Sequence, residues 1–175
     1  FLWQNKNLTQ DDQPFTDFEA FLTTLKAKKR KTIRAERRKV AEQGITCQRK
    51  CGNDITESDW KTFYHCYVMT YAVRGQQPYL TMDFFKALAQ HMAEHLMLAQ
   101  ALDANGEIIA SSLFLYDKPD NKTATLYGRY WGALGEYDSL HFELCYYQGI
   151  EFAIEQGLHY FDPGTQGEHK LIRGF

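Results

Sequence analysis

The chain has 175 residues, of which 44% are apolar and 24% are charged, and its net charge is −2. This length suffices for one hydrophobic core with an appended helix and leaves little room for two full domains. No apolar run approaches the roughly 18 to 20 residues that span a bilayer, and no signal-peptide pattern stands at the start. We therefore expect a cytoplasmic protein without a membrane span.

The two ends of the chain resemble cut points. The sequence begins at Phe1 rather than Met and stops at Phe175 directly after a glycine, without a turn or cap. We expect a piece of a longer polypeptide, truncated at both ends, with the missing remainder as its partner. Within this piece we expect an N-terminal segment with a basic helix at 1–44, followed by a domain at 45–175.

The cysteines indicate neither a disulfide framework nor a metal site. Cys47 and Cys51 are separated by three residues in a segment that we expect to be a strand, and no second pair has zinc-finger spacing. Reduced thiols are the expected state, and no metal is expected.

Positive charge is concentrated in residues 26–39, which carry nine Lys or Arg and one Glu. This segment has a charge of +8, so the rest of a chain with net charge −2 carries −10. Only Ile33 and Val40 continue an apolar face, so we expect one or two basic helices whose cationic half is exposed or lies against a polar surface. The candidate residues for contacting a polyanion such as tRNA are Arg34, Arg37 and Arg38.

The pattern of apolar residues predicts two helices, three consecutive strands, a helix and a short strand. The first helix is capped at Thr56 or Ser58 and ends at 74–75, and the second runs from Thr81 to about His95. The expected strands lie at 45–51, 96–102, 107–117, 123–132 and 159–162, with a turn at 103–106 and a helix at 140–156. This order predicts a mixed α/β fold with helices on a mostly antiparallel sheet.

Three stretches resemble the FemAB-like family of predicted peptidoglycan-associated acyltransferases. They are KKRKTIRAERRKV at 28–40, LYGRYWG at 126–132, and LHFELCYYQGIEFAIEQGLHYFDPGTQGEHKLIRGF at 140–175. The resemblance implies a GNAT-like fold and transferase activity, with the acyl-donor site built from the strand, helix and strand at 123–163. It implies a reaction class and not a substrate.

The donor loop departs from the pattern of GNAT enzymes that use acyl-CoA. Those enzymes carry an Arg/Gln-x-x-Gly-x-Gly/Ala loop, whose backbone N–H groups hold the pyrophosphate. The nearest match here is Arg129-Tyr-Trp-Gly132-Ala-Leu-Gly135, in which the second glycine comes one position late. Both acyl-CoA and aminoacyl-tRNA therefore remain open as donors.

Glu143 is the first candidate catalytic residue. At 100° per residue, the 141–156 helix presents a polar arc formed by His141, Gln148, Glu151, Glu155 and Gln156. Glu143 falls outside this arc, among apolar residues, where a carboxylate with a raised pKa could take a proton from an attacking ammonium. The alternative is that Glu143 caps backbone N–H groups or pairs with an arginine.

A polar segment follows the Pro-Gly turn at 163–164. It contains the candidate bases Glu168 and His169, and the candidate substrate-binding residues Gln166, Lys170 and Arg173. Without the resemblance, this segment reads as a solvated loop. With it, we expect the segment to lie at the mouth of a groove shared with Tyr127, Arg129 and Glu143.

Alternation along the 123–132 strand places Tyr127, Arg129 and Trp131 on one face, and Leu126, Gly128, Tyr130 and Gly132 on the other. An arginine between two aromatic residues suits a substrate groove, and it equally suits an edge packed under a helix.

The leading interpretation is an N-acyltransferase in which an amine attacks the donor carbonyl directly, since no Gly-x-Ser-x-Gly elbow or Cys-His signature is present. Its acceptor would be a small-molecule or peptide amine. The alternative is a non-catalytic module that binds nucleic acid or a cell-wall precursor through the basic helix.

Overall fold

The computed structural model describes residues 2–119, 123–164, 167 and 169–175. Its centre is a six-stranded sheet in the order β1-β6-β5-β4-β3-β2. The strands are β1 (Trp3–Gln4), β2 (Thr46–Cys51), β3 (Leu96–Leu102), β4 (Ile108–Tyr116), β5 (Thr125–Ala133) and β6 (Tyr160–Asp162). Neighbouring strands are antiparallel except for β5 and β6, which are parallel.

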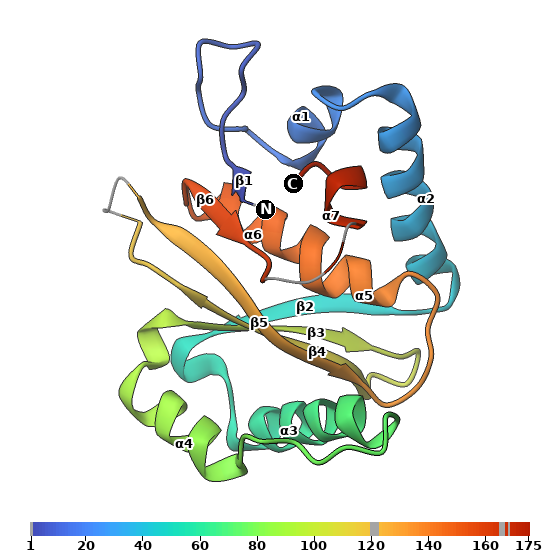
Figure 1. Ribbon diagram of the computed structural model, residues 1–175, viewed down its shortest axis with the longest axis vertical. Coiled ribbons are helices and arrows are strands. Elements are labelled where there is room, and N and C mark those ends of the chain that lie inside the picture. The colour runs from blue at the N-terminus through green and yellow to red at the C-terminus, as the bar shows by residue number, and fades with distance from the viewer. Residues whose placement is uncertain (1, 120–122, 165–166, 168) are drawn as a thin grey trace.

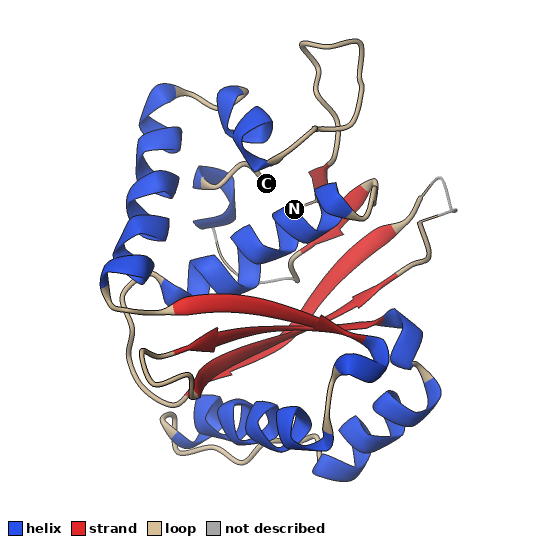
Figure 2. Cartoon of the chain, turned by 180° about the vertical axis from the view of Figure 1, so that it is seen from behind, coloured by secondary structure: helices blue, strands red, loops and turns tan. Residues whose placement is uncertain are grey.

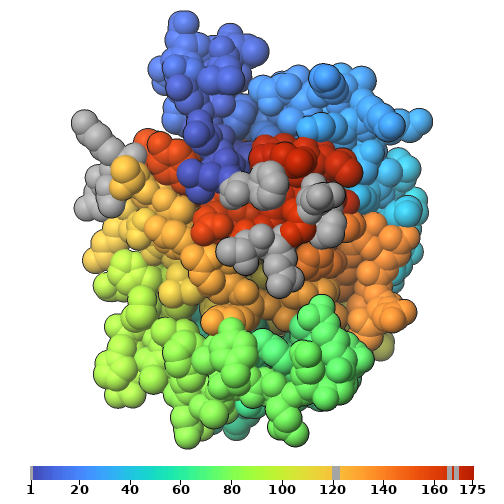
Figure 3. Space-filling model, in the orientation of Figure 1, coloured from blue at the N-terminus to red at the C-terminus, as the bar shows by residue number. Residues whose placement is uncertain are grey.

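Helices cover both faces of the sheet (Figures 1 and 2). The helical elements are α1 (Phe18–Thr23), α2 (Ala27–Glu42), η1 (Gly52–Asp54), α3 (Glu57–Ala72), α4 (Met82–His91), η2 (Ala93–His95), α5 (Leu140–Phe142), η3 (Glu143–Tyr147), α6 (Gln148–Glu155) and α7 (His169–Ile172). In the space-filling view of Figure 3, the α3–α4 layer is green, and α5–α6 lie in orange between it and the blue N-terminal layer. No described helix has the length and apolar character needed to cross a membrane.

The expected hairpin of β3 and β4 is confirmed. Its turn is held by the Asp103 carboxylate, which accepts hydrogen bonds from the backbone N–H groups of Asn105 (2.9 Å) and Glu107 (3.0 Å). Gly106 completes the turn at φ +82°, a left-handed conformation that costs glycine little. The residues of this turn therefore set how β3 and β4 pair at the centre of the sheet.

The start of α3 is fixed by a capping box. The Thr56 hydroxyl accepts from the Asp59 backbone N–H at 3.1 Å, and the Asp59 carboxylate accepts from the Thr56 N–H at 2.8 Å. The aromatic stripe of this helix then packs with Phe85 of α4 on β3 and β4, in a cluster separate from the core on the other face.

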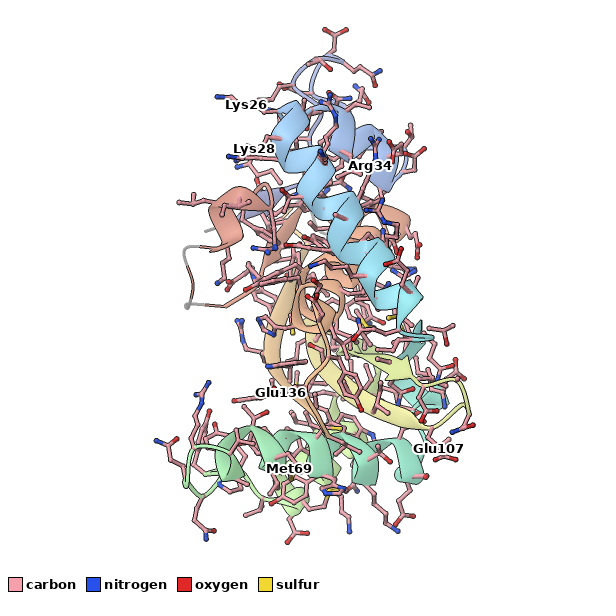
Figure 4. The ribbon with its side chains drawn as sticks, turned by 90° about the vertical axis from the view of Figure 1, so that its right-hand side faces the viewer. Lys26, Lys28, Arg34, Met69, Glu107 and Glu136 are labelled. Atoms are coloured by element: carbon pink, nitrogen blue, oxygen red, sulfur yellow. The ribbon has the colours of Figure 1, made fainter. Side chains whose placement is uncertain are left out.

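Residues 1–44 share the larger of the two hydrophobic clusters with the rest of the chain. Trp3, Phe21, Ile33 and Val40 are buried in the same cluster as Phe161 of β6. Helix α2 lies along the outside of the α5–α6 layer (Figure 4), and only Ile33 and Val40 are buried along it. The basic helix is therefore seated on the core through a narrow apolar stripe.

Candidate functional site

The sheet opens between β5 and β6. Within β5, only Thr125–Tyr127 pair with β6, but β5 continues to Ala133. The last six residues of β5 therefore have no partner strand on that side within the described chain. A cavity of about 550 Å³ lies at this opening. Its lining comprises Tyr67, Thr70, Tyr71, Arg74, Tyr79, Ser112, Gly128, Arg129, Tyr130, Trp131, His141, Cys145, Tyr146, Pro163 and Gly164.

A β-bulge at Arg129 shapes the strand beside the cavity. Gly128 faces Phe114 and Tyr130 faces Leu113, so Arg129 is an extra residue without a partner on β4. The expected alternation is therefore wrong, because the extra residue reverses the sides beyond it. Leu126 packs in the cluster on the α6 face, but Tyr130 packs in the cluster on the α3 face.

The bulge turns Trp131 toward the helix that follows β5. Its ring centroid lies 4.6 Å from that of His141, and both side chains line the cavity. Tyr127, which we expected beside Trp131, is not among the lining residues; its hydroxyl lies 3.3 Å from the Asp117 carboxylate.

The other wall is α3, which lies unusually close to β5. A Cβ atom on Gly132 would lie 1.8 Å from the Cys66 carbonyl oxygen, so only glycine fits there. One turn further along α3, the Thr70 hydroxyl donates to the Trp131 carbonyl at 2.9 Å. These contacts hold the tyrosines of α3 over the end of β5.

The helix after β5 contains a π-helical turn, η3, of five residues. The added residue breaks the 100° period, so the expected polar arc is wrong at Gln148, which is 6% exposed and donates to Glu143 at 2.8 Å. Cys145 and Tyr146 of this turn line the cavity.

The hydroxyls of Tyr67 and Tyr130 beside the cavity stay protonated at neutral pH. Burial, together with the nearby Tyr79 hydroxyl, raises the pKa of Tyr130 to about 12, and burial raises that of Tyr67 well above its ordinary value. Both can therefore donate hydrogen bonds to a ligand.

Glu143 is buried at 4% exposure but is not among the lining residues. Its carboxylate accepts from Arg37 Nε at 3.1 Å, from Arg37 Nη2 at 3.0 Å and from Gln148. Burial and hydrogen bonding occur as expected, and the geometry favours the interpretation in which Glu143 pairs with an arginine.

The C-terminal segment is described in part. Gln166, Glu168 and the side chain of His169 lie outside the described residues. Lys170 is 1% exposed, and its ammonium donates to the carbonyl of Gly164, which lines the cavity. Arg173 is buried too, but it pairs with Glu36 of α2 at 2.5 Å. The structure thus places Lys170 beside the cavity wall and Arg173 in a contact with α2.

The three arginines expected to bind a polyanion are all paired. Arg34 pairs with Glu19, Arg37 with Glu143 and Glu151, and Arg38 with Glu42. Figure 4 shows Lys26 and Lys28 pointing away from the core, at the other end of α2.

Arg74 and His141 are cavity residues that sequence reasoning missed as candidates. Arg74 was interpreted as part of a helix stop, and His141 as part of a polar helix face. The available signal for His141 was its position one residue into the helix after β5, where the chain returns across the open edge.

Among known proteins, the model of the FemAB-like family, described as peptidoglycan biosynthesis/recognition, matches residues 1–175. The chain belongs to this family. No curated protein matches it.

Solved structures share the fold at low identity. L-PGS from Bacillus licheniformis aligns with a TM-score of 0.58 at 14% identity, covering 82% of this chain and 44% of that one. The C-terminal domain of a putative lysylphosphatidylglycerol synthetase from Agrobacterium fabrum gives 0.54 at 14% identity, covering 80% and 43%. A conserved protein of unknown function from Bacteroides thetaiotaomicron gives 0.51 at 18% identity, covering 98% and 53%. The chain thus spans about half the length of these structures, and the predicted mixed α/β fold with a mostly antiparallel sheet is confirmed.

Proposed function

We propose that the cavity at the open edge of β5 is an N-acyltransferase site, which moves an acyl or aminoacyl group from an activated donor onto an amine. The observation that carries the proposal is the parting of β5 from β6. Within the described chain, it leaves residues 128–133 of β5 without a partner strand beside a cavity, where their backbone N–H groups can hold the donor and the developing oxyanion. Membership of the FemAB-like family supports the same reaction class.

The reaction proceeds by direct attack. The lone pair of the amine attacks the donor carbonyl carbon, a C–N bond forms, and the C–S bond of an acyl-CoA or the C–O bond of an aminoacyl-tRNA breaks. The leaving thiolate or alkoxide takes up a proton, and a base accepts the proton that the amine loses. The cavity supplies positioning, hydrogen-bond donors and that base.

His141 is our candidate for the base. It lines the cavity beside Trp131, and a neutral imidazole has a ring nitrogen that can accept a proton. Glu168 and His169 stay predicted as further candidates, because they follow the cavity residue Gly164 in the sequence. Glu143 is not among the residues that line the cavity, so we assign it to positioning of the helix.

The test offers acyl-CoA and charged tRNA separately to the purified protein, with a panel of small and peptide amines, and follows products by mass spectrometry. Replacing His141 by Asn should lower turnover by roughly 10²-fold, the usual effect of losing a base. His65→Asn, an exposed histidine on α3, is the matched control and should leave turnover unchanged. Absence of transfer from either donor to every amine would contradict the proposal.

A further inference from the structure

The charged side chains that line the cavity are basic, among the residues that the structure describes. Arg74 and Arg129 contribute its only charged lining side chains in the described chain, and no carboxylate is among the lining residues. The lining therefore offers guanidinium groups rather than carboxylates to a ligand, although the Asp162 carboxylate lies 3.5 Å from Arg129.

Arg74 lies just past the end of α3 and is available to a ligand. Its backbone N–H donates to Tyr71 at 2.9 Å, and the following Gly75 turns the chain at φ +65°. The side chain is exposed and takes part in no ion pair among the described residues. The turn therefore presents the guanidinium group at the cavity wall, and no anion of the described residues neutralises it.

Arg129 comes from the bulge on β5 and is only weakly neutralised. Its Nη2 lies 3.5 Å from the Asp162 carboxylate, and both side chains are about one third exposed, at 36% and 35%. Exposed pairs of this kind contribute little energy. The guanidinium also lies over the Tyr127 ring at 5.1 Å, which orients it without consuming its N–H donors.

Aromatic rings line the cavity together with the two arginines. Tyr71 and Tyr79 meet edge to face at 6.0 Å, and Tyr79 is 68% exposed although it lines the cavity. An exposed ring and a guanidinium in the same cavity lining give a ligand both an apolar surface and an ionic contact.

We propose that Arg74 and Arg129 hold an anionic group, a carboxylate or a phosphate, of the molecule that occupies the cavity, while Tyr71 and Tyr79 contact its uncharged part. This inference rests on the proposed acyl transfer and specifies the substrate of that site. Guanidinium groups bind carboxylates and phosphates through paired N–H donors, which fixes the ligand in orientation as well as in place.

The anionic group can belong to the donor or to the acceptor. Calorimetric titration of the purified protein with three matched pairs separates these sources: coenzyme A against pantetheine, phosphoethanolamine against ethanolamine, and alanine against alaninamide. We expect the anionic member of at least one pair to bind ten-fold or more tightly, with an affinity that falls as salt is added. The first pair identifies the donor, and the other two identify the acceptor.

Three variants locate the contact. Arg74→Gln and Arg129→Gln should each remove most of the preference for the anionic member. Asp162→Asn should strengthen anion binding several-fold, because it frees Arg129 but keeps the oxygen that accepts the Gly164 N–H at 2.9 Å. Arg38→Gln is the control, since Arg38 is an exposed residue of α2 outside the cavity lining.

The inference is overturned if no probe with an anionic group binds, if the members with and without that group bind equally, or if the Arg74 and Arg129 variants keep the full preference. Transfer activity is scored separately in the same preparations. A preference for anions without any transfer would support the anion site and contradict the proposed acyl transfer. Transfer that depends neither on ligand charge nor on the Arg74 and Arg129 variants would support the transferase and contradict the anion site.

Discussion

Arg37 of α2 and Glu143 of η3 are 106 residues apart in sequence, yet the Arg37 guanidinium donates two hydrogen bonds, of 3.1 and 3.0 Å, to the Glu143 carboxylate. Arg37 also donates to Glu151 at 2.6 Å, and its guanidinium lies 4.6 Å over the Phe18 ring. One cation thus ties the basic helix to the helix that lines the cavity.

Removing that cation should destabilise the fold. Arg37→Ala leaves the buried Glu143 carboxylate without its partner, which typically costs about 3 to 5 kcal/mol of unfolding free energy. Arg38→Ala breaks an exposed pair on the same helix and should cost less than about 1 kcal/mol. Urea unfolding measures both. Equal effects would mean that the Arg37 contact is as weak as a surface pair.

Gly132 sets how closely α3 can approach β5. A methyl group at this position would overlap the Cys66 carbonyl, so Gly132→Ala must push α3 away at a cost of about 3 kcal/mol, and ligand binding in the cavity should weaken with it. Gly135→Ala is the control, because its added methyl would meet only the Tyr137 side chain at 3.3 Å. A stable Gly132→Ala protein with unchanged binding would contradict this account of the wall.

Cys145 should not act as a nucleophile even though it lines the cavity. Burial raises the pKa of its thiol to about 12, and its sulfur lies 3.6 Å from the Ser112 hydroxyl, so little thiolate exists at neutral pH. Cys145→Ser should keep turnover within about three-fold, as expected when the amine attacks the donor directly. Alkylation by iodoacetamide at about pH 8 should be at least ten-fold slower than for a free thiol. Fast alkylation with loss of activity would point to a covalent intermediate.

Sequence reasoning succeeded where local chemistry decides the structure. The capping box at Thr56 and the Asp103–Gly106 turn depend on residues within four positions of each other, and both elements were predicted. These features require no knowledge of distant contacts.

The features that the sequence did not predict depend on single-residue insertions and on partners far away in the chain. One extra residue at Arg129 in β5 reverses the side on which later residues lie, and the π-helical turn η3 rotates later residues around the helix axis; regular periods cannot reveal such insertions. The partner of Glu143 is on a helix about 100 residues away, and sequence alone could not choose it among the cations of α2. The cavity lining was therefore only partly predictable: Arg129 and Trp131 were found, and Arg74 and His141 were not.

Lys170 should make the unfolding free energy depend on pH in the alkaline range. Burial lowers the pKa of its ammonium, an effect partly offset by the Asp162 carboxylate, so the folded state releases this proton at a lower pH than the unfolded state. Between the lowered pKa and the ordinary value of about 10.4, the unfolded state binds more protons, and the contribution of Lys170 to stability rises with pH. The unfolding free energy of the wild type, relative to Lys170→Met, should therefore increase from about pH 7 to about pH 10 in urea titrations. Lys28→Met, which removes an exposed lysine of α2, should show no such trend. A constant difference between wild type and Lys170→Met would mean that the ammonium is solvated, and the contact with Gly164 would then not hold the turn at the cavity wall.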